Sequence, residues 1–570
     1  MQDRFYIAGQ LRQMGRLLSV MGENPFKIRA YERAARALEN VADDFDARIK
    51  ERRLTEIDGI GKALAAVVEE IYHTGESVLL QQLSDQLPPG AVDLNEVPGL
   101  TLKKIVALHE RLGIKSVDDL KTACEKELVR AVKGFGQKAE ANILAAIEKL
   151  QHREDRTLIS HALADAQPLL RYLRGISAVA DCEIAGSLRR CKETVRQICI
   201  VAASADRKNV LERFLRYPLF VQSDEVGTGR CTGHLSRGLD VELQIVPPEE
   251  YATALHYWTG SKDHYTALVD RARSKGIVMS VEGLRGPKGK ALKVETENDI
   301  YRRLGLEYIA PELRENQGEI EAAANGSLPK TVVVDDIQGM VHCHTTYSDG
   351  QNTIEEMARA AEALGMQYIT FTDHSPTASY AGGVKIDRLR AQWEEIDRVQ
   401  ERVRIKLLKG TESDILEDGL LDYPDYILEK FDVIIASIHT RHKMNIDQMT
   451  ARLLRALKLP LFKIWGHPLG RLIESRPPFE CRMDEVLDAV AASPAAIEVN
   501  GDPRRLDLEP RWIRAARQRG IKFVVSTDAH SIKNLQNLAY GVAMACRGWL
   551  SRDDILNTLP VEQFTEAVRP

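Results

Sequence analysis

This sequence has no long apolar runs and no pairs of cysteines at CxxC spacing. No run approaches the roughly 18–20 apolar residues that cross a membrane. The first residues, Met1–Phe5, lack the basic and then apolar order of a signal peptide. The 8 cysteines show no CxxC spacing, so we expect reduced thiols and no disulfide frame. These absences predict a cytoplasmic protein that makes no contact with a membrane.

An excess of basic residues is also missing. The formal net charge of −5 argues against a wholly basic nucleic-acid binder, but it leaves room for local basic patches. With 44% hydrophobic and 28% charged residues, the composition is typical of globular proteins. At 570 residues the chain is long enough to form several domains.

From Met340 onward the sequence alternates between short apolar runs and segments with helical spacing, such as 354–363 and 483–492. Seven apolar runs are present: Met340–Val341, Tyr368–Phe371, Ile405–Leu408, Val433–Ala436, Leu461–Ile464, Ile497–Val499 and Phe523–Val525. Apolar strands that alternate with helices indicate a parallel sheet covered on both faces. If the sheet closes into a barrel, the carboxyl ends of its strands gather at one mouth.

Six of these seven runs lead into His, Asp or Glu, whereas the run that ends at Val499 leads into Asn500. A lone histidine is usually a surface or core residue, but the repetition at strand ends predicts a metal site. Nine side chains are candidate ligands: His342, His344, Asp349, His374, Glu412, His439, His467, Asp528 and His530. Imidazole and carboxylate suit Zn²⁺, Mn²⁺ or Fe²⁺ better than Ca²⁺ or Mg²⁺ alone.

Nine candidates exceed what one four-coordinate ion needs, so we expect two or three ions. A carboxylate shared between them would be Glu412. A cluster of this kind activates water and clamps the oxygens of a phosphoryl displacement.

Six segments of this region resemble a PHP (polymerase and histidinol phosphatase) domain: His342–Gly350, Thr372–Ser375, Gly410–Glu412, Ser437–His439, Gly466–Pro468 and Thr527–His530. All nine candidates match the ligand positions of that family. The resemblance implies a distorted β7α7 barrel with a trinuclear metal site and hydrolysis of phosphomonoesters or DNA phosphodiesters. It also implies catalytic roles for four of the nine, namely His342, His344, Glu412 and Asp528.

The N-terminal part of the chain shows helical spacing and three glycine turns. The turns carry Gly59, Gly61 and Lys62 in Ile57–Lys62, Gly99 and Lys104 in Val97–Lys104, and Gly134, Gly136 and Lys138 in Lys133–Lys138. Each is a helix-hairpin-helix signature, in which backbone N–H groups approach a phosphate and read no base. One such turn is more often a plain helix cap, but three copies favour sequence-independent DNA binding.

Residues from 150 to about 315 switch to a mixed α/β pattern, with expected strands at Thr194–Ala203 and Leu239–Val246. The segments Glu183–Arg190 and Tyr257–Lys262 resemble the palm and thumb of family X DNA polymerases. The resemblance implies that Gly186, Ser187, Arg189 and Arg190 hold a nucleoside triphosphate. It also implies that Lys27, Arg29 and Tyr31 bind a 5′-phosphate of DNA.

The catalytic carboxylates of that family are replaced in this chain. The Asp-x-Asp positions read Gln197-Ile198-Cys199, and the third Asp position reads Glu242. Mg²⁺ prefers anionic oxygen ligands, so we expect a degenerate nucleotide site and a palm without polymerase activity.

The resemblance to bacterial polymerases of family X with a PHP domain covers essentially the whole chain and predicts a multidomain protein. We expect an all-α helix-hairpin-helix region over 1–85 and 86–150, and an α/β nucleotidyltransferase-like palm and thumb over 151–315. A linker over 316–335 and the PHP barrel over 336–570 complete the expected order.

Four functions are compatible with this organisation. The first is a DNA-repair nuclease with 3′–5′ exonuclease activity, together with abasic-site endonuclease or 3′-phosphatase activity. The second is an active gap-filling polymerase with an editing PHP domain, which the palm substitutions oppose. The third is a non-catalytic DNA-binding scaffold, which the full ligand set opposes. The fourth is a small-molecule phosphatase, which the three hairpin motifs oppose.

The first hypothesis, a DNA-repair nuclease, determines which metal ions and which DNA partners we expect. We expect Mn²⁺ as the activating ion, with Zn²⁺ and then Mg²⁺ as alternatives. The expected partner is gapped, nicked, 3′-ended or abasic DNA, bound without sequence preference.

Overall fold

The computed structural model describes residues 4–39, 45–57, 59–95, 97, 99–151, 156–227, 229–235 and 238–569. The chain forms two compact units. The first unit comprises Met1–Arg156 and Asp206–Leu243, and the second comprises Thr157–Ala205 and Gln244–Pro570. In the described part of the chain, no helix is long and apolar enough to span a membrane.

The first unit begins with two groups of short helices. Helices α1 (Arg4–Val20), α2 (Pro25–Glu39), α3 (Phe45–Lys50), α4 (Lys62–Thr74) and α5 (Val78–Asp85) surround one buried cluster that contains Leu11, Met14 and Val68. Helices α6 (Ala91–Asn95), α7 (Leu102–Leu112), α8 (Val117–Glu125) and α9 (Gln137–Gln151) surround a second, which contains Leu94, Ile105 and Ile147. The helical periodicity of the sequence is confirmed in both groups.

Each predicted glycine turn precedes a helix. Gly59, Gly99 and Gly134 have positive φ angles of 91°, 89° and 97°, a conformation that glycine adopts without steric cost. The turns lead into α4, α7 and α9 respectively. Asp58 and Pro98, which belong to the first two motifs, lie outside the described residues.

The first unit also contains α12 (Arg207–Leu215) and the antiparallel hairpin of β5 (Phe220–Gly227) with β6 (Arg230–Leu235). Strand β7 (Asp240–Val246) follows. It matches the strand expected over Leu239–Val246.

The second unit begins with the palm. Strand β1 (Thr157–Leu158) leads into α10 (Ile159–Arg174) and pairs antiparallel with β3 (Thr194–Val195). Strand β2 (Asp181–Ala185) precedes the short helix α11 (Gly186–Arg189) and pairs antiparallel with β4 (Gln197–Ala203). The single strand expected over Thr194–Ala203 is therefore two strands, which are separated at Arg196.

The thumb packs around a buried cluster that contains Leu268, Ile300 and Ile320. Its elements are α13 (Tyr251–Thr259), α14 (Lys262–Ser274), the three-stranded sheet of β8 (Val278–Ser280), β9 (Gly283–Arg285) and β10 (Ala291–Leu292), α15 (Glu297–Arg303) and α16 (Glu319–Asn325). Helix α16 lies within the segment 316–335 for which a linker is expected. Ile320 and Ala323 of this helix are buried in the thumb cluster, so the helix packs with the thumb.

Seven parallel strands form the predicted barrel. They are β11 (Gly339–Cys343), β12 (Tyr368–Phe371), β13 (Lys406–Asp414), β14 (Val433–Ser437), β15 (Ile464–Trp465), β16 (Ala496–Asn500) and β17 (Phe523–Ser526), and they pair in chain order. A bridge between Cys343 and Ala529 brings the first strand next to the last and nearly closes the barrel. The apolar run Leu461–Ile464 differs from the observed strand, because Leu461 and Phe462 precede β15 and do not belong to it.

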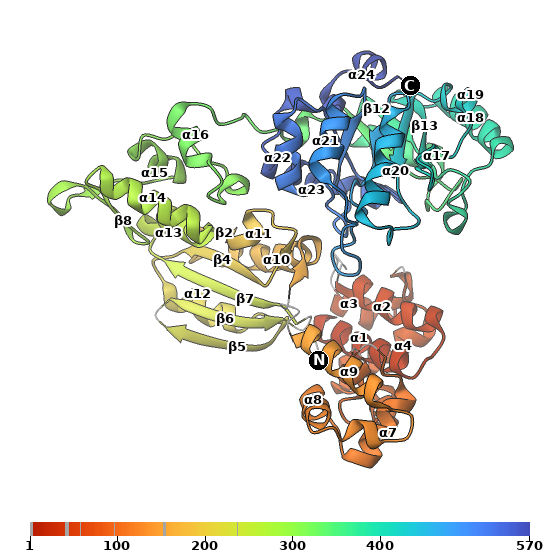
Figure 1. Ribbon diagram of the computed structural model, residues 1–570. Coiled ribbons are helices and arrows are strands. Elements are labelled where there is room, and N and C mark those ends of the chain that lie inside the picture. The colour runs from red at the N-terminus through yellow and green to blue at the C-terminus, as the bar shows by residue number, and fades with distance from the viewer. Residues whose placement is uncertain are drawn as a thin grey trace. The chain divides into compact units, whose positions relative to one another are not determined.

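Helices follow the strands and cover the barrel, as Figure 1 shows in cyan and blue. They are α17 (Ile354–Ala363), α18 (Ile386–Gln400), α19 (Asp425–Leu428), α20 (Ile446–Lys458), α21 (Met483–Ala491), α22 (Pro510–Gln518), α23 (Leu538–Arg547) and α24 (Val561–Val568). Because all seven strands point the same way, their carboxyl ends meet at one mouth.

Candidate metal centre

All nine predicted ligands lie at this mouth. His342 belongs to β11, and Glu412 belongs to β13. The others occupy loops that follow strands: His344 and Asp349 after β11, His374 after β12, His439 after β14, His467 after β15, and Asp528 and His530 after β17. Most of these side chains are buried, but Asp349 is 36% exposed and opens the cluster to solvent.

Glu412 lies at the centre of the cluster. The ring nitrogens of five histidines lie 2.7–3.6 Å from its two carboxylate oxygens: those of His467, His374, His439, His342 and His344. This is the position that a bridging carboxylate requires.

Three overlapping groups of side chains in the described part of the chain have ligand atoms within 4.8 Å of one another. The first holds His344, Asp349, His374 and His530, the second His342, His344 and Asp528, and the third His374, Glu412 and His439. His344 and His374 each belong to two groups. His467 belongs to none of the three and touches the cluster through Glu412 Oε1.

Four ring nitrogens of this cluster are buried and form no ordinary hydrogen bond with the described residues, although they face the Glu412 carboxylate at 3.0–3.6 Å: Nε2 of His342, His344 and His439, and Nδ1 of His374. A buried polar atom without a partner is costly, and an imidazole nitrogen is a common metal ligand. The donor set of imidazoles and carboxylates therefore fits divalent cations.

The carboxylates of the cluster are ionised and attract positive charge. Burial raises the pKa of Glu412, but His439 and His342 hold it well below its ordinary value. Burial likewise opposes the ionisation of Asp349, whose pKa falls to about 2 beside His530 and His344. Burial lowers the pKa of His439, but Glu412 and Asp414 raise it to about 9. Protons and metal ions therefore compete for the same nitrogen atoms.

A second layer of side chains orients the predicted ligands, and the sequence analysis missed it. Glu498 Oε1 lies 2.5 Å from His342 Nδ1, which directs the opposite nitrogen, Nε2, toward the cluster. Asp414 Oδ1 lies 3.0 Å from His439 Nδ1 in the same way. Partners of this kind fix the ring orientation of metal-binding histidines. A signal was present, because Glu498 is the one charged residue in the apolar strand β16.

Asp528 is held by two further residues that the sequence analysis did not single out. Asn500 Nδ2 donates to Asp528 Oδ2 at 3.1 Å, and Arg505 Nε lies 3.1 Å from the same oxygen. Both partners lie on or after β16, the strand that carries no predicted ligand. Both partners bind Oδ2, and the other carboxylate oxygen of Asp528, Oδ1, points at His342 and His344.

The backbone is strained where some of these ligands sit. His342, His467 and Asp528 have φ angles of 67°, 24° and 48°, a region that residues other than glycine rarely adopt and that clusters at functional sites. Next to His467, a Cβ atom on Gly466 would lie 2.4 Å from Ile435 Cγ2. Only glycine fits at position 466, which explains the glycine of the Gly-His-Pro motif.

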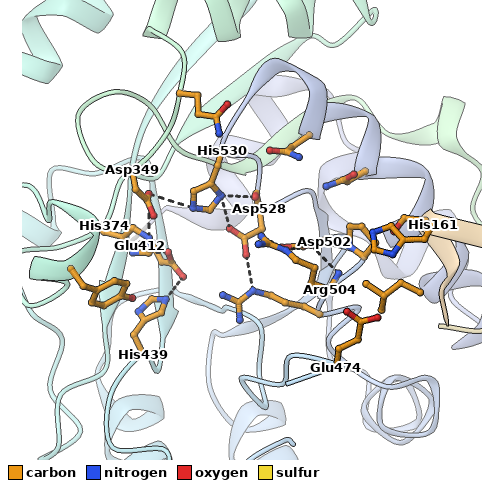
Figure 2. Close-up of a pocket in the computed structure, with 18 residues that line it drawn as sticks. His161, Asp349, His374, Glu412, His439, Glu474, Asp502, Arg504, Asp528 and His530 are labelled. Atoms are coloured by element: carbon orange, nitrogen blue, oxygen red, sulfur yellow. Dashed lines mark hydrogen bonds and ion pairs between the residues drawn. The ribbon is translucent and has the colours of Figure 1, made fainter. Parts of the chain in front are cut away.

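The cluster forms one end of a cavity of about 670 Å³ (Figure 2). Asp349, His374, Glu412 and His439 lie on one side of the view, and Asp502, Arg504 and His161 lie on the other. The palm contributes Leu158, Ser160 and His161 to the lining. A volume of this size is within the usual range for a bound small ligand.

The predicted DNA-binding residues lie in the first unit, and their environments differ. Lys62 and Lys138 are exposed near the starts of α4 and α9, and so are the turn glycines Gly61, Gly99, Gly134 and Gly136. Lys104 Nζ donates to Gly99 O at 2.7 Å and lies 5.6 Å from the centre of the Phe135 ring. The second and third glycine turns therefore touch through this lysine.

The residues predicted to bind a 5′-phosphate are partly engaged elsewhere. Lys27 Nζ lies 3.5 Å from Glu23, and the Arg29 guanidinium lies 5.2 Å from the centre of the Phe26 ring. Tyr31 is 8% exposed and packs in the first helical cluster, which favours a packing role for its ring.

The predicted nucleotide-binding arginines are paired with carboxylates. Arg189 donates to both oxygens of Glu297 and to Thr259 Oγ1 at 2.6–3.0 Å. Arg190 Nε lies 3.0 Å from Glu315 Oε1. Both carboxylates belong to the thumb part of the chain.

The other residues predicted to bind a nucleotide also lie close to neighbouring residues of the protein. Gly186 and Ser187 open helix α11, and a Cβ atom on Gly186 would lie 3.4 Å from Cys199 Cβ. In the first unit, Glu242 Oε1 lies 2.8 Å from Arg230 Nε. The residue at the third carboxylate position thus already has a cationic partner.

Comparisons with known proteins identify four domain families in the chain. Residues 4–77 match a helix-hairpin-helix domain, and residues 91–149 match a SAM-like helix-hairpin-helix tandem. Residues 254–315 match the DNA polymerase beta thumb, and residues 341–501 match the PHP domain.

Three similar proteins differ in how much of the chain they share. The DNA polymerase/3′-5′ exonuclease PolX of Bacillus subtilis is 35% identical over 550 residues, which is 95% of each chain. A probable phosphatase of Thermoanaerobacter sp. (strain X514) is 31% identical over 229 residues, 38% of this chain and 89% of its own. DNA polymerase lambda of Rattus norvegicus is 23% identical over 339 residues, 54% of this chain and 56% of its own.

Proposed function

The chain belongs to the bacterial family X DNA polymerases that carry a C-terminal PHP domain, and we propose that it is a DNA-repair enzyme that hydrolyses DNA phosphoesters with divalent metal ions. The main activity in this proposal is that of a 3′–5′ exonuclease. Cleavage at abasic sites and removal of 3′-phosphates are further activities of the same site.

One observation carries this proposal: the other eight predicted ligands gather at one mouth with Glu412, and several buried imidazole nitrogens face its carboxylate without an ordinary hydrogen bond. Such a set has no packing purpose. When bound, divalent ions would activate water and neutralise charge on the phosphate. Mn²⁺ is our preferred ion and Zn²⁺ the alternative, because imidazole and carboxylate together suit them, and Mg²⁺ is third.

The chain's own residues prepare the site for that chemistry. Glu498 and Asp414 fix the rings of His342 and His439. Arg505 and Asn500 hold Asp528 in place. Preorganised groups of this kind avoid rearrangement during the reaction.

The proposal assigns DNA binding to the helical region of the first unit. Exposed glycine turns, with Lys62, Lys104 and Lys138 beside them, suit contacts to backbone phosphates without sequence preference. Gapped, nicked, 3′-ended and abasic DNA are the expected forms. The proposed location is the cytoplasm, which agrees with eight free cysteines.

A gap-filling polymerase is the second candidate, because the similar protein of Bacillus subtilis is named both polymerase and exonuclease. Gln197 and Cys199 offer no anionic oxygen, and Glu242 is paired with Arg230. Positions without an anionic oxygen hold Mg²⁺ poorly. We therefore propose that polymerase activity is lost.

The test compares cleavage of 3′-recessed, abasic and 3′-phosphate DNA by the full-length protein and by a variant with His342→Ala and His344→Ala. We expect the variant to lose all cleavage and to keep DNA binding. A control with His73→Ala and His234→Ala replaces two exposed histidines outside the cavity. Unchanged cleavage by the first variant would refute the proposal.

A further inference from the structure

The palm lines the cavity of the candidate hydrolase. Ser160 and His161, in the first turn of α10, face the same cavity as Glu412 and Asp528. Figure 2 shows His161 at the opposite side of the view from His374 and Glu412, near Arg504. His161 is exposed, and Leu158 is buried. The polymerase-like part of this unit therefore forms a wall of the hydrolase cavity.

This wall is fixed to the barrel through Glu193. The Ile159 N–H donates to Glu193 O at 3.0 Å, within the β1–β3 pairing that carries Leu158. The Glu193 carboxylate accepts from Arg547 of α23 at 2.7 Å and lies 3.6 Å from Arg471. Both arginines belong to the PHP domain.

The connection continues to the metal centre. Arg471 Nε donates to Arg505 O at 2.7 Å, and Arg505 holds Asp528. A chain of direct contacts thus links the start of α10 with a predicted metal ligand. The position of Ser160 and His161 relative to the cluster is consequently set by ion pairs and backbone hydrogen bonds.

The chemistry of the wall suits a second phosphate. The amino end of a helix favours an anion, and no acidic residue lies in the first turn of α10. Ser160 and His161 add a hydroxyl and an imidazole, both of which hydrogen-bond to phosphate oxygens. Arg504, which also lines the cavity, adds a guanidinium from the barrel side that is paired with Asp502 at 2.7 Å.

We propose that Ser160, His161 and the amino end of α10 bind the backbone phosphate next to the scissile one. The palm then selects a polynucleotide strand as the substrate of the hydrolase, in preference to a small phosphomonoester or a single nucleotide. This inference rests on the proposed function of the metal centre.

The test compares two substrates of the full-length enzyme with Mn²⁺: a short oligothymidylate and the p-nitrophenyl ester of thymidine 5′-monophosphate, which has no neighbouring phosphate. The variant carries Ser160→Ala and His161→Ala. The matched control is Gln167→Ala, an exposed residue of the same helix that does not line the cavity.

The double variant should lose roughly 10- to 100-fold in kcat/KM for the oligothymidylate, mainly through KM, the size expected for a lost charged hydrogen bond. It should hydrolyse the ester at the unchanged rate. Ser160→Ala with His161→Lys should recover part of the loss, because the lysine ammonium can donate a hydrogen bond to the phosphate. Gln167→Ala should match the unmodified enzyme for both substrates.

An equal loss for both substrates, or no loss for either, would overturn this inference and leave the proposed function standing. If the unmodified enzyme hydrolyses neither substrate, the proposed function itself fails. Melting temperatures of the variants check that these substitutions leave the fold unchanged.

Discussion

Replacement of Glu193 by glutamine should destabilise the second unit by about 3 kcal/mol. Burial raises the pKa of this carboxyl, but Arg547 and Arg471 lower it from 4.5 to about 2. At about 1.4 kcal/mol for each pKa unit, the shift corresponds to roughly 3 kcal/mol of stability. The Glu193 side chain is 20% exposed and that of Arg547 is 7% exposed, so solvent screens this pair weakly.

The pH dependence follows from the direction of the shift. Because the pKa is lower in the folded protein, the contribution is complete above about pH 5 and is lost as the pH falls toward the folded value. Glu193→Gln removes this contribution. The difference in unfolding free energy between the two proteins should therefore be constant near neutral pH and shrink below about pH 5.

Denaturant unfolding followed by tryptophan fluorescence measures this difference in the full-length protein. All 5 tryptophans of the chain lie in the second unit, so the signal reports on the unit that contains Glu193. Glu282→Gln, at an exposed position, is the control and should change little. A Glu193→Gln protein within about 0.5 kcal/mol of the unmodified one, at every pH tested, would refute the reasoning.

Three further predictions concern the separate sites. Glu498→Gln should weaken Mn²⁺ binding roughly 10- to 100-fold in calorimetry, because His342 loses its orienting carboxylate; an unchanged Kd would contradict this role. In the nuclease-dead background of His342→Ala and His344→Ala, primer extension on gapped DNA should be undetectable with Mg²⁺ or Mn²⁺, and robust extension would promote the polymerase hypothesis. DNA binding should weaken steeply with salt, and joint replacement of Lys62, Lys104 and Lys138 by alanine should reduce the slope of log K against log salt by roughly 3; an unchanged slope would show that these lysines make no phosphate contacts.

The barrel and its ligands could be predicted because both depend on local pattern. Apolar runs of strand length, six of the seven followed by an imidazole or carboxylate, indicate strands and candidate ligands without knowledge of the tertiary structure. The orienting residues could not be found in that way. Glu498 and His342 are far apart in sequence, and only the barrel brings them within 2.5 Å.

The palm shows the same limit. Nothing in the sequence indicates that Arg189 pairs with Glu297, or that Leu158, Ser160 and His161 line a cavity with residues of the PHP domain. Helix α16 was missed because Asn325-Gly326-Ser327 is typical of a linker, whereas Gly326 caps the end of that helix in the left-handed conformation. Long-range packing and cap geometry decided these features.

The near-closure of the barrel has a consequence for biosynthesis. His342 and His344 come from the first strand, and Asp528 follows the last, yet the three form one candidate ligand group. Because chains fold from the N-terminus as they leave the ribosome, the helical DNA-binding region should be folded well before β17 has been made. Under the function proposed above, a nascent chain would hold DNA before it could cut it, because the candidate ligand group is complete only after β17 has been made.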